Sequence, residues 1–420
     1  MIKKTYTKLT NGLPLLIIEI PHAKSCAVTY WSKAGTRFNP EGKEGLAHFL
    51  EHLLLKKTKK YDSNEKLARV LESVGASTNG WTGREGLTLY VNCATKDFER
   101  SISVLSEMVR NPLIDKDSIL SERKVIEKEI ARKQSRPDDL IWELWFKLFF
   151  NNSPLEHPNL GTKESINKLI RSDFINYWKN DFRTKDSLLA IAGGIKFKDV
   201  LSKANKYFSK DKLKEKKVPT FNYKKGKSLI IKKMDLPQSS LLISFRTFGG
   251  PISKETYPLI MLRIIIGSGW SSRITQRLRI KESLIYGWGT NIARYYDTGS
   301  YTIRMGTEKN KIPKLTSILG EELRKIIKEG ITEDELKLYK GYITGSMLAG
   351  MQTPWDYLNY YAADELYDPG TIESVEERVK NINKITRSQV NDVARKYLRE
   401  DNWYMALVGD NKPGDIDFHL

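Results

Sequence analysis

Cysteine, histidine and long apolar runs are all scarce in this sequence of 420 residues. The two cysteines, Cys26 and Cys93, are too few for a disulfide framework, so we expect a reducing, cytoplasmic location. No run of eighteen apolar residues occurs, which argues against a membrane-spanning helix. The apolar segment 13–20 follows an Asn-Gly turn and has no small-residue cleavage site after it. We therefore expect a buried strand there rather than a signal peptide.

Basic residues outnumber acidic ones by 70 to 51, for a formal net charge of +19. Such an excess can attract nucleic acid, an anionic membrane surface or an acidic partner. The lysines are spread along the chain, apart from a cluster between Lys206 and Lys233, and no zinc finger or RNA-recognition motif occurs. We expect a solvated basic surface and no specific nucleic-acid partner, with a basic nucleic-acid-binding protein as the alternative from another functional class.

Two strand-containing patterns occur once in each half of the chain. The segment "SCAVTYWSKAGTRF", from Ser25, matches "SSLLISFRTFGGP", from Ser239, as an alternating strand that runs into a loop. The segment "LTLYVNCATKDFERSISVLSEMV", from Leu87, matches "YTIRMGTEKNKIPKLTSILGEEL", from Tyr301, as a strand, a turn and an amphipathic helix. The chain therefore contains an internal repeat of about half its length.

The repeat predicts an α+β fold of two homologous domains, each a mostly antiparallel sheet packed with helices. We expect the N-terminal domain at residues 1–208 and the C-terminal domain at residues 229–420, which are ordinary domain sizes. The connecting residues 209–228 are charged, contain Pro219 and lack periodicity, as is typical of a linker.

The stretch "GLAHFLEHLLLKKT", residues 45–58, places titratable side chains in an apolar helix. His48 and His52 are four apart and share a helix face, so two imidazoles can hold one zinc ion. Glu51 beside them is suited to take a proton from a water molecule at the metal. The chain has only five histidines, so two at metal spacing favour a site over an accidental pair. The H-x-x-E-H order is the inverted zinc-protease motif.

A catalytic zinc site needs a third protein ligand. The helix predicted at residues 117–134 carries Glu122 and Glu129 two turns apart on one face. For Glu129, a metal ligand and a salt bridge are both open, and the unfilled ligand position favours the metal. For Glu122, a salt bridge or a cap partner is an equal alternative. The second repeat has an apolar stretch at residues 258–269 in place of the histidines, so only the first domain is expected to hold metal.

The segments "GLAHFLEHLLLKKT", "ASTNGWTGREGLTLYV" and "SERKVIEKEI" together resemble the pitrilysin family of inverzincin zinc metallopeptidases. The half-size branch, similar to mitochondrial processing peptidase and its bacterial relatives, matches best, and the resemblance covers nearly the whole chain. It implies a zinc endopeptidase with one Zn²⁺ per chain and Glu51 as the general base. The zinc ligands that it implies are His48, His52 and Glu129. It also implies that Glu122 supports these ligands from outside the metal shell.

The resemblance further implies that Asn79 and Gly80 lie on an edge strand that contacts substrate, although the family has alanine where this chain has Gly80. From the residues alone, an ordinary Asn-Gly turn is the alternative. Arg279 and Tyr286 match an arginine–tyrosine pair that stands near the scissile bond in the family and can stabilise an oxyanion. From the residues alone, they could equally be a surface charge and a core aromatic.

One chain supplies two domains and both motifs, whereas the family closes a four-domain chamber. The resemblance therefore implies a homodimer, in which each active site is completed by the other protomer, and a peptide or unfolded substrate. A heterodimer with another chain and a non-catalytic structural or partner subunit of the same fold are the alternatives. Manganese or cobalt would also suit the same ligands.

Overall fold

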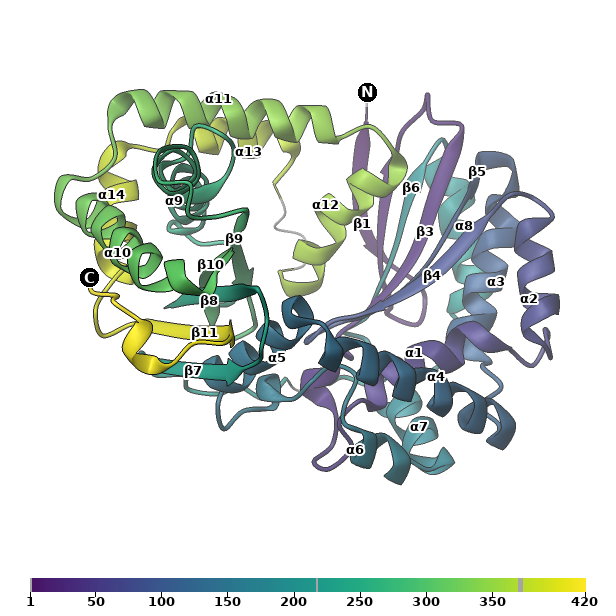
Figure 1. Cartoon of the computed structure of the whole chain (residues 1–420). Helices are drawn as coiled ribbons and strands as arrows, with labels where there is room; N and C mark the ends of the chain where they lie inside the picture. The colour runs from purple at the N-terminus through teal and green to yellow at the C-terminus, as the bar shows by residue number, and fades with distance from the viewer. Residues whose placement is uncertain (1, 217, 369–372) are drawn as a thin grey trace. The chain divides into compact units, whose positions relative to one another are not determined.

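The computed structural model describes residues 2–216, 218–368 and 373–420, which form two compact units. Each unit is assembled from three separate stretches of chain. The first unit comprises Met1–Arg132, His157–Pro219 and Gly350–Ile372. The second comprises Lys133–Glu156, Thr220–Ala349 and Glu373–Leu420. Figure 1 shows the elements of both units.

The first unit is built on a six-stranded sheet in the order β1-β2-β6-β3-β5-β4. Its strands are β1 (Lys3–Lys8), β2 (Pro14–Glu19), β3 (Ser25–Ser32), β4 (Ser77–Thr82), β5 (Leu87–Ala94) and β6 (Leu188–Gly193). Neighbouring strands are antiparallel except for the parallel pair β2 and β6. All of β6 is buried, as its apolar sequence predicts, and β4 forms one edge of the sheet.

The helices of this unit are α1 (Leu46–Lys56), α2 (Asn64–Glu72), α3 (Phe98–Arg110), α4 (Lys116–Ser135), α6 (Lys163–Lys168), α7 (Arg171–Tyr177), α8 (Phe197–Phe208) and α12 (Pro354–Tyr367). Both faces of the sheet are covered, one by α3 and α8 and the other by α12 (Figure 1). The helix α3 turns Phe98, Ile102 and Leu105, spaced three and four apart, into the main core with α1 and α8. The helix α12 packs on β6, β3 and β2, and its Trp355 ring lies 4.4 Å from that of Tyr90.

The second unit repeats this plan with a five-stranded sheet in the order β7-β11-β8-β10-β9. Its strands are β7 (Lys227–Lys233), β8 (Gln238–Thr247), β9 (Gly287–Arg294), β10 (Gly299–Glu308) and β11 (Trp403–Gly409). The strands β7 and β11 are parallel and the other pairs are antiparallel, so the pairing matches that of β2, β6, β3, β5 and β4. The α+β class with two homologous, mostly antiparallel halves is confirmed.

The helices of the second unit are α5 (Pro137–Phe149), α9 (Thr256–Gly267), α10 (Ile312–Glu329), α11 (Glu333–Gly350), α13 (Val375–Asn383) and α14 (Arg387–Tyr397). The main core lies between the sheet and a helical layer that includes α9, α10 and α14. The opposite face is covered by α5, whose Trp145 and Phe149 pack with Tyr404, Ala406 and Val408 of β11. In the described part of the chain, no helix combines the length and the apolar character that crossing a membrane requires.

The division into units differs from the expected contiguous domains 1–208 and 229–420 at two helices. The helix α5 lies before residue 208 in the sequence, yet it packs on the sheet of the second unit. The helix α12 follows residue 229, yet it packs on the sheet of the first. The reason is that each sheet is apolar on both faces, and each unit takes the helix for its second face from the other half of the sequence.

We predict that Trp145→Ala destabilises the second unit, although Trp145 lies in the N-terminal half of the sequence. Trp145 is 1% exposed and stacks 4.9 Å from Phe149, so its truncation should cost about 3–5 kcal/mol. Hydrogen exchange read by mass spectrometry should accelerate in β8 and β11 and stay unchanged in β3 and β5. The matched control, Phe174→Ala in α7, should give the opposite pattern, because Phe174 is buried in the core of the first unit. Acceleration of β3 and β5 in the Trp145 variant would contradict the exchange of helices.

Candidate functional site

The helix α1 starts at a glycine that the backbone requires. Gly45 has φ of 88°, a left-handed conformation that favours glycine, and a Cβ there would lie 2.5 Å from the carbonyl oxygen of Leu160. The helix then buries Phe49, Leu50 and Leu53 in the core of the first unit. Its periodicity leaves the two histidines on another face, where they are only partly buried.

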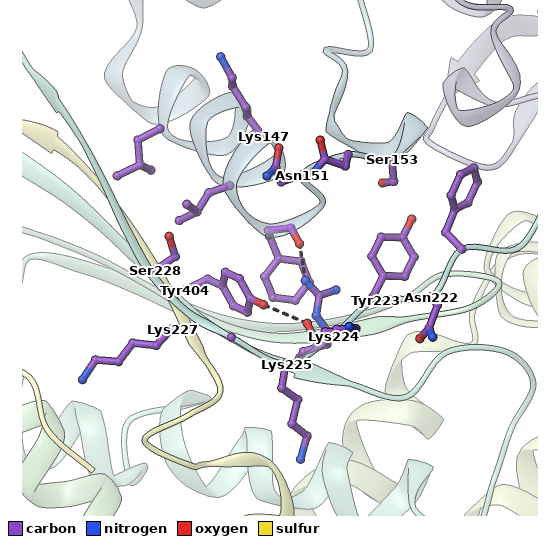
Figure 2. A pocket seen from close by; sticks show the side chains of 17 residues that line it. Lys147, Asn151, Ser153, Asn222, Tyr223, Lys224, Lys225, Lys227, Ser228 and Tyr404 are labelled. Atoms are coloured by element: carbon purple, nitrogen blue, oxygen red, sulfur yellow. Dashed lines mark hydrogen bonds between the residues drawn. The ribbon is translucent and has the colours of Figure 1, made fainter.

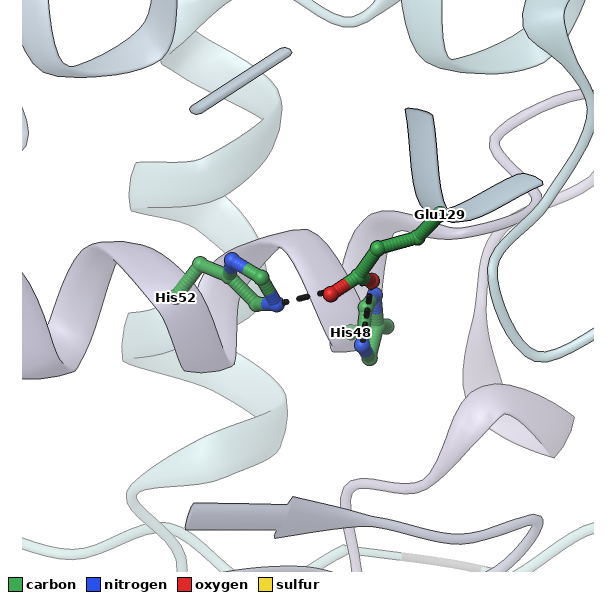
Figure 3. Close-up of side chains that lie close together, drawn as sticks. All are labelled: His48, His52 and Glu129. Carbon is green, nitrogen blue, oxygen red and sulfur yellow. Dashed lines mark ion pairs between the residues drawn. The ribbon is translucent and has the colours of Figure 1, made fainter. Parts of the chain in front are cut away.

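His48, His52 and Glu129 converge as the sequence predicts. One ligand atom from each of the three lies within 4.8 Å of the others, and they form the one such set among the residues that the structure describes. Glu129 Oε2 lies 3.8 Å from His48 Nε2 and 4.0 Å from His52 Nε2. Figure 3 shows the Glu129 carboxylate, carried by α4, reaching toward both imidazole rings of α1.

This donor set fits zinc. Two atoms that bind one zinc ion tetrahedrally lie about 3.4 Å apart, so the observed separations require only small side-chain rotations. Two imidazoles and one carboxylate are a common ligand set for catalytic zinc, and they leave the fourth position for water or substrate. His48 and His52 are 14% and 18% exposed at their side chains, which shields the site without closing it.

Glu122 supports one of the histidines rather than joining the three converging atoms. Its Oε2 lies 3.1 Å from Nδ1 of His52, so Nε2 of the same ring faces Glu129. Its other oxygen accepts a hydrogen bond from Lys56. Burial alone would raise the pKa of Glu122, but the hydrogen bonds from Lys56 and His52 outweigh it, and the pKa is lowered. Glu122 is therefore an ionised acceptor that orients His52.

Glu51 is held in a different environment from Glu122 and Glu129 of α4. It is 7% exposed, and the hydroxyl of Thr82 on β4 donates a hydrogen bond to its Oε2. Burial raises the pKa of Glu51, and the Thr82 hydrogen bond opposes this shift only in part. A desolvated carboxylate next to the histidine pair is a suitable proton acceptor.

Gly80 lies against Glu51, and this contact explains why a small residue is needed there. A Cβ at position 80 would lie 2.7 Å from Cγ of Glu51, closer than van der Waals contact allows. Thr78, Gly80 and Thr82 face the same side of β4, because side chains alternate along a strand. Glycine at the position where the family has alanine therefore gives the Glu51 side chain more room.

Asn79 lies on the other side of the strand and is exposed, with its Oδ1 accepting a hydrogen bond from the backbone N–H of Gly80. One cavity of about 650 Å³ in the first unit has Asn79, Glu51, His48, His52, Glu122 and Glu129 among its lining residues. The sequence alternative of an isolated Asn-Gly turn is wrong, because both residues belong to the edge strand β4.

Arg279 and Tyr286 come together in the second unit. Arg279 lies in the π-helical segment Thr275–Lys281, donates a hydrogen bond of 2.9 Å to the carbonyl of Ile285, and stands 5.8 Å from the Tyr286 ring centroid. Tyr286 is 46% exposed, so it is not a core aromatic. Its hydroxyl donates to Glu308, a partner that sequence reasoning did not identify.

Sequence reasoning also missed Thr82 and Lys56, which contact Glu51 and Glu122. A signal for Thr82 exists, since it lies two residues after Gly80 in a strand and must face the same side. A signal for Lys56 also exists, since it lies four residues after His52 on the same face of α1, but only the packing of α1 against α4 brings it to Glu122.

We predict that Glu122→Gln weakens zinc binding without abolishing it. Loss of the charged acceptor leaves the His52 ring less firmly oriented, and such changes outside the metal shell cost about 10–100-fold in affinity. The dissociation constant of zinc, measured by competition with a chromogenic chelator, should rise accordingly. Glu127→Gln is the matched control on the same helix, because Glu127 bonds to Asn167 instead of a histidine. Equal affinity of the Glu122 variant and wild type would contradict the orienting role.

Known proteins resemble this chain in sequence. The insulinase family profile (peptidase family M16) matches residues 15–163, and the profile named peptidase M16 inactive domain matches residues 168–341. A protein named uncharacterized zinc protease from Rickettsia bellii is 30% identical over 342 residues, covering 81% of this chain and 82% of its own. A protein of the same description from Bacillus subtilis is 28% identical over 413 residues, covering 97% and 98%.

Solved structures share the fold. A protease from Helicobacter pylori has a TM-score of 0.90 at 19% identity, covering 98% of this chain and 100% of its own. A peptidase M16 inactive domain from Pseudomonas fluorescens has a TM-score of 0.89 at 17% identity, covering 98% and 99%. The resemblance seen in the sequence is confirmed: the chain belongs to the insulinase family of zinc proteases, peptidase family M16.

Proposed function

We propose that this protein is a zinc endopeptidase that hydrolyses peptides or unfolded segments, with one Zn²⁺ per chain and Glu51 as the general base. The observation that carries the proposal is the convergence of His48, His52 and Glu129 beside the buried carboxylate of Glu51. The names of the relatives, which call them zinc proteases, support the same activity.

His48, His52 and Glu129 would hold the ion, which when bound supplies the Lewis acidity that polarises a peptide carbonyl and a water molecule. Glu51 accepts the proton of the attacking water and delivers it to the nitrogen of the leaving amine. Thr82 holds the Glu51 carboxylate through its hydroxyl, and Glu122 keeps His52 in the orientation that points Nε2 toward the site.

The edge strand β4 offers a way to bind an extended peptide. A peptide that pairs with β4 would continue the sheet, and its main chain would pass the cavity at Asn79 and Gly80. Backbone pairing reads the main chain rather than the side chains, so substrate preference should be loose. It also requires an unfolded substrate, because a folded one has no free strand to add.

We further propose that Arg279 and Tyr286 complete the site from a second protomer of a homodimer. Their support is the presence of both motifs in one chain together with the contact between the two side chains. The Tyr286 hydroxyl would donate its hydrogen bond to the developing oxyanion of the substrate instead of to Glu308, while Arg279 holds the substrate carbonyl.

The cytoplasm remains the expected location, because the chain contains only two cysteines.

We expect Glu51→Gln to retain stoichiometric zinc and to lose cleavage of an unstructured, internally quenched fluorescent peptide by about 10²–10⁴-fold, the usual contribution of a general base. Metal content measured by mass spectrometry separates loss of metal from loss of base. Removing zinc from wild type with a chelator should abolish cleavage, and adding zinc should restore it. Glu127→Gln should behave as wild type. If zinc-loaded wild type does not cleave the peptide, the alternative function, a non-catalytic subunit of the same fold, is favoured. The description of the second matched profile, an inactive domain, is compatible with that alternative.

The hydrogen bond to Glu51 gives a finer test. Thr82→Val keeps the shape of the buried side chain and removes the donor, so kcat should fall by about tenfold while KM and zinc content stay unchanged. Thr82→Ser keeps the donor and should restore most of the rate. Equal loss in both variants would show that packing at Thr82, rather than its hydroxyl, is what matters.

A further inference from the structure

The second unit contains a basic pocket that the proposed peptidase activity does not use. Its volume is about 650 Å³, and it is lined by the C-terminal end of α5, residues 221–228, and side chains from β7, β8 and β11. Five cations line it, and none of its lining residues is acidic. They are Lys147, Lys224, Lys225, Lys227 and Arg246. This charge makes an anion the expected ligand.

Arg246 is the strongest indication, because its guanidinium is buried without a counter-ion. It is 6% exposed, and no carboxylate oxygen of the described chain lies within 4.0 Å of it. Its terminal nitrogens donate to Thr298 Oγ1 at 3.2 Å and to the carbonyl of Phe149. Its Nε is buried and has no hydrogen-bond partner. Burying a cation without an anion is costly, and an anionic ligand would compensate for that cost.

Aromatic rings surround the same guanidinium. Its Cζ lies 4.1 Å from the ring centroid of Phe149, 5.1 Å from that of Tyr404 and 5.2 Å from that of Tyr223. These rings partly offset the burial of the charge and also provide flat apolar walls. Tyr223 and Tyr404 flank the centre of the pocket in Figure 2. A ligand that carries a flat ring can stack on such walls.

The rim supplies further charge and polarity. Lys227 is already paired with Glu400, and Lys225 reaches the carbonyl of Lys396 at 3.4 Å. Lys147 and Lys224 form no ion pair in the part of the chain that the structure describes, and both are exposed, so their flexible side chains can follow an anionic group. Side-chain amides and hydroxyls complete the rim at Asn151, Asn222 and Ser153 (Figure 2).

We propose that this pocket binds a small organic phosphate that carries a flat ring. The phosphate pairs with Arg246 and the lysines at the rim, the ring stacks on the tyrosines, and the amides bond to polar groups at the edge of the ring. A volume of about 650 Å³ lies within the range of pockets for ligands of this size. The pocket lies wholly in the second unit and shares no residue with the zinc cavity, so this inference is independent of the proposed peptidase activity.

Calorimetric titration of the full chain with adenosine 5′-monophosphate tests the proposal, with adenosine and inorganic phosphate as probes of the two halves of the ligand. We expect saturable binding of the monophosphate, and binding of adenosine and of inorganic phosphate each at least about tenfold weaker, since each lacks one set of contacts. Bound monophosphate should also slow amide exchange in residues 221–228, which line the pocket.

Variants show whether the pocket is the site. The double variant Lys147→Ala with Lys224→Ala should weaken binding of the monophosphate about tenfold or more, whereas Lys232→Ala, an exposed lysine of β7 outside the pocket, should leave it unchanged. Arg246→Gln should abolish binding, with its fold checked by hydrogen exchange of β8. Arg246→Gln removes a buried group. If this variant fails to fold, the double variant of Lys147 and Lys224 provides the decisive comparison.

Several results would overturn the proposal. No saturable binding of the monophosphate up to about 1 mM would do so, as would equal binding by the double variant and wild type. Inorganic phosphate binding as tightly as the monophosphate would show a general basic surface instead. Tight, salt-sensitive binding of a short single-stranded oligonucleotide without binding of the monophosphate would identify a nucleic-acid surface and equally overturn the small-molecule site.

Discussion

Both sheets of this protein have two apolar faces, and the rest of the structure depends on how the second face of each sheet is covered by a helix. The strands β6 and β11 are buried along their whole length, which requires helices on both sides. The helix α5 covers the second sheet and α12 covers the first, each supplied by the opposite half of the sequence. The helix α4 therefore begins in the first unit and runs into the segment that belongs to the second. The same helix carries Glu122 and Glu129.

The candidate metal site follows a related rule, that a polar group near a core needs a partner. On α1, each titratable side chain is matched to a specific group on another element: Glu51 to Thr82 on β4, and His52 to Glu122 on α4. His48 and His52 share the Glu129 carboxylate. Polar contacts therefore connect three elements of the first unit at this site, α1, α4 and β4. A zinc ion would add a further tie between α1 and α4.

The second unit keeps the strand pairing of the first, but its described residues include no group that could hold a metal ion. Where α1 carries histidines, the corresponding helix α9 buries Met261, Leu262 and Ile265. This unit has polar groups at other points instead: Arg279 lies beside Tyr286, and Arg246 lies among aromatic rings. One pattern of strands thus supports distinct chemical environments, because the side chains differ between the two units.

The sequence alone determined the periodic features: the repeat, the apolar faces of the helices, and the spacing of His48, His52, Glu122 and Glu129. The helix faces and spacings follow from the 3.6-residue period of the helix, and the repeat can be seen by comparing the two halves of the sequence. The repeat also predicted the fold class, whereas the family followed from the resemblance of three sequence motifs. The tertiary structure decided the exchange of α5 and α12, the hydrogen bond from Thr82 to Glu51, the contact of Lys56 with Glu122 and the burial of Arg246. Each of these joins residues far apart in the chain, and each depends on which apolar surfaces gain the most free energy by packing together. No short stretch of sequence encodes that balance.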